Sequence, residues 1–263
     1  MNFRIGCDPE LFLQDATGGL HSAIGLIGGT KQEPRPLPCG EGFAVQEDNV
    51  ALEFNIPAAE SKAQLQEYIS RVMNTLKEEI RPYNYQFSKL SAALFPEEDI
   101  KHPMAMVFGC DPDFNAWTNG KRNPRPKADD HRLRSAGGHV HVGYQFKQKT
   151  DILTLTKLMD LCLAVPSVLM DQGELRKQLY GKAGAFRVKP YGMEYRTLSN
   201  FWVAQEDPNY VGWVWDATAQ AIQLLESNSL DVDSLEQDIL NAVNNNNKET
   251  AHHLCRAHNL ICL

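Results

Sequence analysis

Four short segments of the chain carry polar or charged side chains two positions apart, next to apolar neighbours. The four pairs are Asp8/Glu10, Glu53/Asn55, His139/His141 and Glu194/Arg196. Residues i and i+2 of a β-strand point to the same face of its sheet, so each segment is expected to be a strand with one polar face. One pair alone would indicate only a solvated strand face. Four pairs predict one antiparallel sheet with a shared charged concavity.

The segment Gly137-Gly-His-Val-His-Val-Gly143 is the most distinctive of the four. By strand rise its two imidazoles would lie about 6–7 Å apart on one face, opposite Val140 and Val142. Such a pair suits a metal ion or a phosphate group. A histidine pair on a solvated strand is the simpler alternative, and the three other polar pairs favour a ligand site over it.

The carboxylates of the other segments indicate which ligand to expect. Within one cleft they would repel one another, which raises their pKa values unless cations neutralise them. Oxygen-rich ligation with few histidines favours Mg²⁺ or Mn²⁺ over zinc. Arg187, Arg196 and the basic loops could then clamp an anion. Divalent cations, carboxylates and arginines together are typical of phosphoryl transfer.

Hydrophobic periodicity predicts the elements that hold these residues. A strand over residues 3–13 is expected to be an edge or to be irregular at Pro9, which cannot donate to a ladder. A strand from 49 to 57 precedes a helix over 61–80, capped by Ser61, which would cover the apolar face of the sheet. Further elements are a strand at 85–95, an apolar helix at 151–172 interrupted by Pro166, a helix at 208–227 and two helices within 231–258.

Two loop segments carry further polar residues. The stretch 108–118 contains Asp111, Asn115 and Trp117, which are interpreted as substrate contacts, with a capped turn and a packed tryptophan as the alternative. The basic, proline-containing stretch 121–134 is interpreted as a lid or a loop that faces phosphate.

Composition argues against several classes of protein. A net charge of −7 disfavours a general nucleic-acid binder, whose footprint is a basic patch. The chain has neither a P-loop nor a dinucleotide fingerprint. We expect no signal peptide, no transmembrane span and no membrane partner. The six cysteines show no CxxC spacing, which indicates structural thiols in a reducing cytoplasm.

Taken in order, four motifs carry a family resemblance. They are Gly6-Cys-Asp-Pro-Glu10, Asp48-Asn-Val-Ala-Leu-Glu-Phe-Asn55, Gly137-Gly-His-Val-His-Val-Gly143 and Gly192-Met-Glu-Tyr-Arg196. With them the sequence resembles the glutamine synthetase-like carboxylate–amine ligases, and most closely their phage-type COOH-NH2 ligase type 2 branch. The resemblance covers residues 6–200. It implies an α+β fold in which a curved, mainly antiparallel sheet forms a concave active site backed by helices. We expect one catalytic domain over 1–263, whose C-terminal part, from about 208, is helical.

The resemblance also implies roles for individual residues. One Mg²⁺ (or Mn²⁺) would be bound by Asp8, His139 and Glu194, and a second by Glu10 and Glu53. The nucleotide would be bound by His141, Arg134, Lys182 and Lys189. Catalysis would involve Arg187, Arg196 and Glu53, and substrate binding Asn55, Asp111 and Asn115. Two departures from the family pattern stand out. Asp8 is one methylene shorter than the usual glutamate, and the extra acidic ligand of the second metal is left open between Glu47 and Asp48.

The implied activity is ATP-dependent amide bond formation of the glutamine synthetase type, independent of the ATP-grasp type. ATP would phosphorylate a carboxylate of an amino acid or peptide, and an amine would then displace phosphate. Two alternatives stay open: a metal-dependent hydrolase that uses the His-x-His strand, and a non-catalytic nucleotide- or metal-binding phage protein. The expected location is the cytoplasm, that of the host if the gene is phage-encoded. The substrate pair and the oligomeric state stay open.

Overall fold

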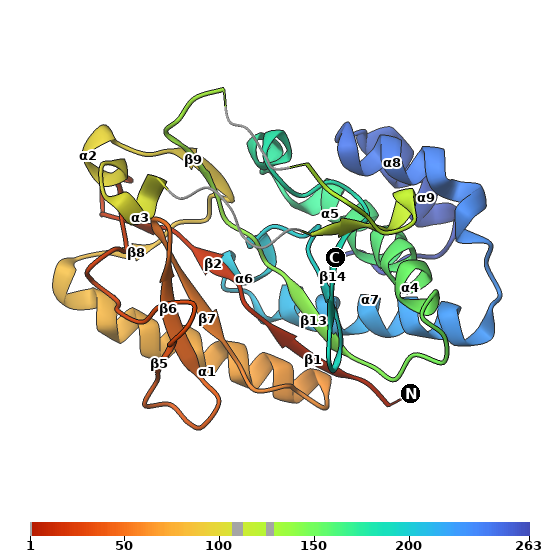
Figure 1. The fold of residues 1–263 in the computed structure, drawn as a ribbon, viewed down its shortest axis with the longest axis horizontal. Coiled ribbons are helices and arrows are strands. Elements are labelled where there is room, and N and C mark those ends of the chain that lie inside the picture. Colours follow the sequence, from red (N-terminus) through yellow and green to blue (C-terminus); the bar gives the residue numbers. More distant parts are fainter. Residues whose placement is uncertain (1, 107–112, 125–128) are drawn as a thin grey trace.

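The computed structural model describes residues 2–106, 113–124 and 129–263, and within them every strand pair is antiparallel (Figure 1). A six-stranded sheet contains, in spatial order, β1 (Arg4–Cys7), β13 (Val140–Gly143), β15 (Gly192–Tyr195), β14 (Ala185–Lys189), β10 (Phe114–Asn115) and β11 (Lys121–Arg122). A four-stranded sheet contains β2 (Glu10–Leu11), β7 (Ala51–Asn55), β6 (Ala44–Asp48) and β5 (Arg35–Pro36). Two smaller sheets pair β4 (Leu20–His21), β3 (Leu13–Gln14) and β8 (Gln86–Phe87), and β12 (Leu133–Ser135) with β9 (Ala92–Leu94).

Helices surround these sheets. The α-helices are α1 (Lys62–Ile80), α2 (Glu97–Ile100), α3 (Pro103–Met106), α4 (Asp151–Met159), α5 (Val165–Met170), α6 (Phe201–Ala204), α7 (Pro208–Ser227), α8 (Glu236–Asn244) and α9 (Lys248–Ala257). The short helical segments are η1 (Arg81–Tyr83), η2 (Ala116–Thr118), the π-helical η3 (Asp160–Ala164), η4 (Glu174–Gln178) and η5 (Val232–Leu235). The sequence-based prediction of mixed antiparallel sheets and helices is confirmed at this level.

The first strand of the chain is divided between the two larger sheets. β1 pairs with β13, whereas β2 pairs with β7, so the chain passes from one sheet to the other at Asp8 and Pro9. Pro9 has no N–H to donate, and no ladder continues through it. The irregularity expected at Pro9 is therefore confirmed. The prediction of one sheet is wrong, because this bend separates the four polar pairs into two sheets that meet there.

Helix α1 forms as the sequence predicts. The Ser61 hydroxyl accepts a hydrogen bond from Gln64 N at 3.2 Å and so caps the helix. The helix lies along the four-stranded sheet (Figure 1) and shares its core. Its buried residues recur with helical spacing: Leu65, Ile69, Val72, Met73, Leu76 and Ile80. Helix α1 thereby covers the apolar face of β7, and Glu53 lies on the opposite face of the sheet.

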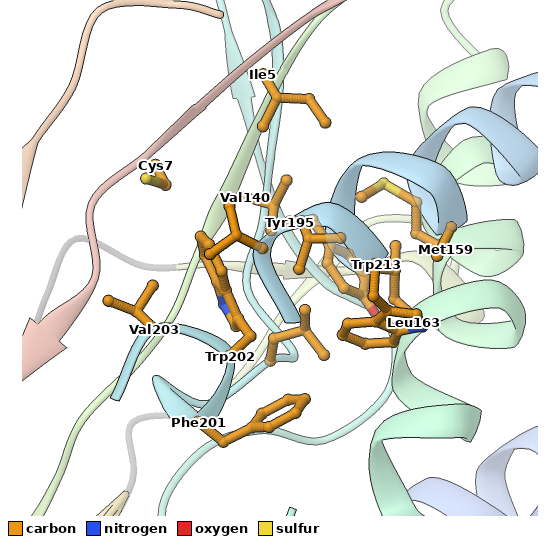
Figure 2. Close-up of a cluster of buried hydrophobic side chains, with 14 of the residues drawn as sticks. Ile5, Cys7, Val140, Met159, Leu163, Tyr195, Phe201, Trp202, Val203 and Trp213 are labelled. Atoms are coloured by element: carbon orange, nitrogen blue, oxygen red, sulfur yellow. The ribbon is translucent and has the colours of Figure 1, made fainter. Parts of the chain in front are cut away.

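The six-stranded sheet buries its apolar face among the helices that follow it in the chain. Figure 2 shows strand and helix side chains in one buried cluster, with labels on Ile5, Cys7, Val140, Met159, Leu163, Tyr195, Phe201, Trp202, Val203 and Trp213. Burial of one such large side chain stabilises the fold by about 1.5–3 kcal/mol. Because strand side chains alternate, packing of Tyr195 in this core directs its neighbours Glu194 and Arg196 to the opposite face.

The apolar stretch predicted as one interrupted helix forms α4, η3 and α5. Pro166 lies at the start of α5, directly after the π-helical η3, so the helix continues through a residue that cannot donate a backbone hydrogen bond. The stretch Asp151–Met170 contains an 18-residue window with a mean hydropathy of 1.7 and is long and apolar enough to cross a membrane. The expectation that no segment reaches such a length is therefore wrong. However, 72% of the most apolar window is buried inside the protein, as in the core helix of a globular fold.

The remaining elements follow the predictions in part. The helices expected at 208–227 and within 231–258 are present as α7, α8 and α9. The single strand expected at 85–95 is instead two short strands, β8 and β9, which belong to different small sheets. Short apolar runs specify strand character but not the partner strand, since pairing depends on distant segments.

Candidate active site

A cavity of about 960 Å³ lies between the polar faces of the two larger sheets, and we call it the central cavity. It brings together residues that are far apart in the sequence. Its lining includes ten of the residues predicted to be functional: Asp8, Glu10, Glu53, Asn55, Arg134, His139, His141, Arg187, Lys189 and Arg196. Glu194 is fully buried directly behind this lining, in contact with several of them.

A row of residues across the six-stranded sheet builds one wall of the cavity. His141 on β13 lies opposite Glu194 on β15, and Glu194 lies opposite Arg187 on β14. Directly opposed residues of antiparallel strands share a face, so these three side chains point the same way. On the other side of His141 the row ends at Gly6 of β1, which has no side chain to pack beside the imidazole.

Asp8, His141 and Glu194 form the first acidic cluster. One donor atom from each lies within 4.8 Å of the others. The carboxylate of Asp8 faces both histidines, with Oδ2 3.2 Å from His141 Nε2 and Oδ1 3.2 Å from His139 Nδ1. Burial raises the pKa of Asp8, but the charge of His141 and the close contacts with both imidazoles outweigh it and hold the pKa well below its usual range.

The two histidines differ in a way that the sequence did not predict. His141 belongs to the three-residue cluster, and the Tyr191 hydroxyl lies 2.7 Å from its Nδ1, which leaves Nε2 to face Asp8. His139 Nδ1 instead lies 3.3 Å from Arg196 Nη1. Burial and the Arg196 charge lower the pKa of His139 to about 4, so this imidazole is neutral at physiological pH. The three-residue cluster thus contains His141 and not His139, and the role of His139 as a metal ligand stays a prediction.

Glu194 is the most strongly compensated carboxylate of the site. Lys189 Nζ lies 2.7 Å from Oε2 and Arg187 Nη1 3.4 Å from Oε1, and Arg196 donates to Oε1 as well. Burial raises the pKa of Glu194, but the Arg196 charge and the histidines outweigh it and leave the pKa at about 2. Glu194 is therefore ionised throughout the physiological range.

The first cluster offers buried donor atoms to a cation. Asp8 Oδ1, His141 Nε2 and Glu194 Oε2 are all buried and make no hydrogen bond with the described residues, although ion-pair contacts face them. If His139 Nδ1 accepts from Arg196 it cannot donate to Asp8, which accounts for the orphaned Oδ1. Two carboxylates and one imidazole suit a hard or borderline divalent ion, so the residues present fit Mg²⁺ or Mn²⁺.

Glu10, Asp48 and Glu53 form a second acidic cluster on the four-stranded sheet. Their donor atoms again lie within 4.8 Å of one another. Gly137 N donates to Glu10 Oε2 at 2.8 Å, and Gln46 Nε2 donates to Glu53 Oε1 at 2.9 Å. Burial and the nearby Asp48 raise the pKa of Glu10 to about 7. Burial and three neighbouring carboxylates raise the pKa of Glu53 well above its usual range. A divalent ion would relieve this repulsion, so the cluster fits a second cation.

Glu47 and Asp48, the two candidates for the additional acidic ligand of the second metal, differ in their contacts. Asp48 lies on the cavity side, where Lys31 Nζ is 2.7 Å from its Oδ2. Glu47 also borders the cavity, but its Oε1 accepts hydrogen bonds from the backbone N–H groups of Gly25, Ile27 and Gly28. Glu47 therefore holds a loop, and Asp48 is the additional carboxylate of the second cluster.

Three residues predicted to bind nucleotide or substrate differ in how they relate to the cavity. Arg134 lines it and donates to Asn49 Oδ1 and to the carbonyls of His131, Leu133 and Ala105. These hydrogen bonds tie β12 to the 102–106 segment, and nucleotide binding by Arg134 stays a prediction. Lys182 is exposed and does not line the central cavity.

Asn115 is also outside the central cavity. Its side chain caps η2 by accepting from Trp117 N at 2.8 Å, which is the capped turn considered as the alternative. Trp117 is packed, and its indole N–H donates to Asp160 at 2.7 Å. Asp111 lies outside the described residues.

Several residues of the site were missed by the sequence reading. Gln46 precedes Asp48 by two positions on β6 and could have been found by the same alternation. Tyr191 and Arg176 carried no such signal. Tyr191 lies in the turn between β14 and β15, and Arg176 lies in the short helix η4. Both reach the site only through tertiary structure.

One family model matches part of the chain. Residues 130–249 match the family model described as phage phiEco32-like COOH.NH2 ligase-type 2. The match includes the wall of the cavity with His139, His141 and Glu194, and it does not include the second acidic cluster. A search of curated proteins found no match.

Among solved structures, a bifunctional glutathione synthetase from Pasteurella multocida aligns with 98% of this chain at 12% identity and a TM-score of 0.45. The alignment covers 49% of that protein, so this chain spans about half of its length.

Proposed function

We propose that this chain is an ATP-dependent carboxylate–amine ligase that forms an amide through an acyl phosphate. One observation carries the proposal: two acidic clusters that each fit a divalent cation face the same cavity, beside several basic side chains. The match of residues 130–249 to a family of carboxylate–amine ligases supports the same class.

The proposed chemistry divides between the two walls of the cavity. Bound Mg²⁺ ions would neutralise the phosphate oxygens of ATP and polarise the γ-phosphate toward a carboxylate nucleophile. Asp8, His141 and Glu194 would hold one ion. Glu10, Asp48 and Glu53 would hold the other. Each set lies on a sheet whose opposite face is packed in the core, which keeps the donor atoms in place.

The basic residues of the first wall would bind the charge that moves during transfer. Arg187 and Arg196 lie against Glu194 and line the cavity, so their guanidinium groups can donate to phosphoryl oxygens there. Lys189 would act in the same way as a point charge. Asn55, which also lines the cavity, would contact the substrate. We also infer the glutamine synthetase-like arrangement from the order of the four motifs, and a cytoplasmic location stays a prediction.

The ligase proposal is tested by turnover. The protein would be incubated with ATP and Mg²⁺ and a panel of amino acids and amines, with ADP measured enzymatically and products identified by mass spectrometry. We expect ADP and a new amide in at least one mixture, and loss of both with Glu194→Gln or Glu53→Gln. Glu41→Gln, at an exposed site before β6, is the matched control and should leave turnover unchanged. ADP release without any amide would contradict ligation.

The same preparations separate the two alternatives. Stoichiometric zinc in the purified protein, with hydrolysis in the absence of ATP, would favour a hydrolase. A non-catalytic protein predicts that Glu10→Ala and Glu194→Ala change stability alone and that nucleotide does not bind. Calorimetry with a non-hydrolysable ATP analogue and Mg²⁺ therefore decides between a ligase and a non-catalytic protein.

A further inference from the structure

Arg176 is a buried cation that the proposed catalytic roles do not use. It lies in η4, lines the central cavity and is only 3% exposed. Its Nη1 donates to the carbonyl of Thr197 at 2.9 Å. Its Nε is buried and makes no hydrogen bond, and within the described parts of the chain no carboxylate forms an ion pair with it. A buried guanidinium with an unsatisfied donor is costly unless an anion binds it.

The surroundings hold this guanidinium in place rather than letting it reach solvent. Gly181, which has a φ of +79°, lies directly against it, and a Cβ atom there would come within 2.2 Å of Arg176 Nη1. The backbone therefore leaves room for the guanidinium at a position where only glycine fits. Two residues that follow η4, Leu179 and Tyr180, line the cavity beside it.

Neighbouring charges act on the Arg176 guanidinium in both directions. Glu10 and Asp171 attract it, and Arg196 repels it. Arg176 and Arg196 both line the central cavity, so two guanidinium groups attract an oxyanion into it.

We propose that Arg176 binds an oxyanion, a carboxylate or a phosphate, of a molecule that occupies the central cavity. The inference rests on the proposed ligase function only for the identity of the molecule that carries the anion. A carboxylate would belong to the amino acid or peptide substrate. A phosphate would belong to the nucleotide. The planar guanidinium fork favours either group over a neutral polar one.

The test measures binding without turnover. Calorimetry in a chloride-poor buffer would use inorganic phosphate, L-aspartate, L-glutamate and neutral L-glutamine, and separately a non-hydrolysable ATP analogue with Mg²⁺. We expect Arg176→Gln to weaken binding of at least one anionic probe by about tenfold or more, the loss of one charge-assisted hydrogen bond. Arg176→Lys, which keeps the charge but not the fork, should lose less. Arg81→Gln, at an exposed position of η1 outside the cavity, is the control and should bind like the native protein.

The pattern of losses identifies the source of the anion. Weaker binding of phosphate and of the ATP analogue places the nucleotide at Arg176, and weaker binding of the dicarboxylates alone places the substrate there. Equal affinities of Arg176→Gln and the native protein for every probe, within about twofold, would overturn the proposal. So would a native protein that binds none of the anions.

A purely structural role for Arg176 is separated by thermal melting. If the role is purely structural, Arg176→Gln lowers the melting temperature with and without anion, and the increase caused by the anion is unchanged. If Arg176→Gln does not fold, the same increment is measured with Arg176→Lys, and an undiminished increment overturns the proposal. Because these measurements need no amide product, a failed ligase assay would leave their outcome intact.

Discussion

Glu10 and Glu53 lie directly opposite each other across β2 and β7, so two glutamates share one cross-strand position beside Asp48. Like charges opposite each other destabilise a sheet, and here burial adds to that cost. The pKa of Glu10 rises to about 7 because burial and the Asp48 charge disfavour its ionised form. A sheet that retains such a pair at a cavity wall is suited to bind a cation there.

This pair predicts a stability that depends on pH and on Mg²⁺. The pKa of Glu10 is higher in the folded chain than its ordinary value of 4.5, so folding favours the protonated form. Stability from this group is complete below about pH 4.5 and is lost as the pH rises through about 7. In EDTA the melting temperature should fall across that window, and Mg²⁺ should restore it. A fall that Mg²⁺ leaves unchanged would contradict a cation site.

Glu10→Gln should remove the part of this pH dependence that responds to Mg²⁺. The amide cannot ionise, so repulsion with Asp48 and Glu53 disappears, while its oxygen can still accept from Gly137 N. We expect a higher melting temperature than the native protein in EDTA at pH 8 and a smaller gain with Mg²⁺. The matched control Glu41→Gln should behave like the native protein in both buffers.

Glu194→Gln should destabilise the fold by about 3 kcal/mol, because it removes the buried counter-charge of Lys189, Arg187 and Arg196. Urea denaturation at pH 7 would measure the free energy of unfolding. The exposed residue Glu60 pairs with Arg4 at the surface, and Glu60→Gln should cost less than about 1 kcal/mol. Equal losses for the two variants would show that the Glu194 cluster contributes no more than a surface ion pair.

The two histidines should differ in their effect on metal binding. His141→Asn removes a donor atom of the first acidic cluster and should weaken Mn²⁺ binding by about tenfold or more, the usual scale for disturbing a metal site. His139→Asn should change Mn²⁺ affinity less, since its Nδ1 lies against Arg196. Electron paramagnetic resonance of free Mn²⁺ gives both affinities. Identical defects, or a larger one for His139→Asn, would favour the assignment expected from sequence.

Asp160 should stabilise β15, which carries Glu194, from the buried side of the sheet. Its buried carboxylate accepts from Trp117 Nε1 and Tyr195 OH, each at 2.7 Å. Asp160→Asn replaces one acceptor oxygen with a donor amide, and we expect a loss of about 1–3 kcal/mol in unfolding free energy. Trp117→Phe in the same background should recover part of that loss, because the unsatisfied indole N–H is removed with its partner. Additive losses in this double-mutant cycle would show that Asp160 and Trp117 do not interact.

Local sequence patterns determined the elements and the face on which each polar pair lies. Strand alternation placed Glu53 and Asn55 on one face of β7 and His139 and His141 on the cavity side of the six-stranded sheet. Helical spacing and the Ser61 cap located α1, and the C-terminal helices followed from the same periodicity. These features are predictable because they depend on residues a few positions apart.

Tertiary structure alone decided the partner of each charged side chain. In sequence Arg134, Lys182 and Arg176 are similar basic residues. In the fold, Arg134 is held by carbonyl oxygens, Lys182 is exposed and Arg176 lines the cavity with an unsatisfied donor. Likewise Asp48 joins the second acidic cluster, while its neighbour Glu47 accepts hydrogen bonds from the N–H groups of a loop. The role of a charged residue depends on its burial and on groups that are distant in the chain. The bend at Pro9 brings the two larger sheets to one cavity and so brings such groups together.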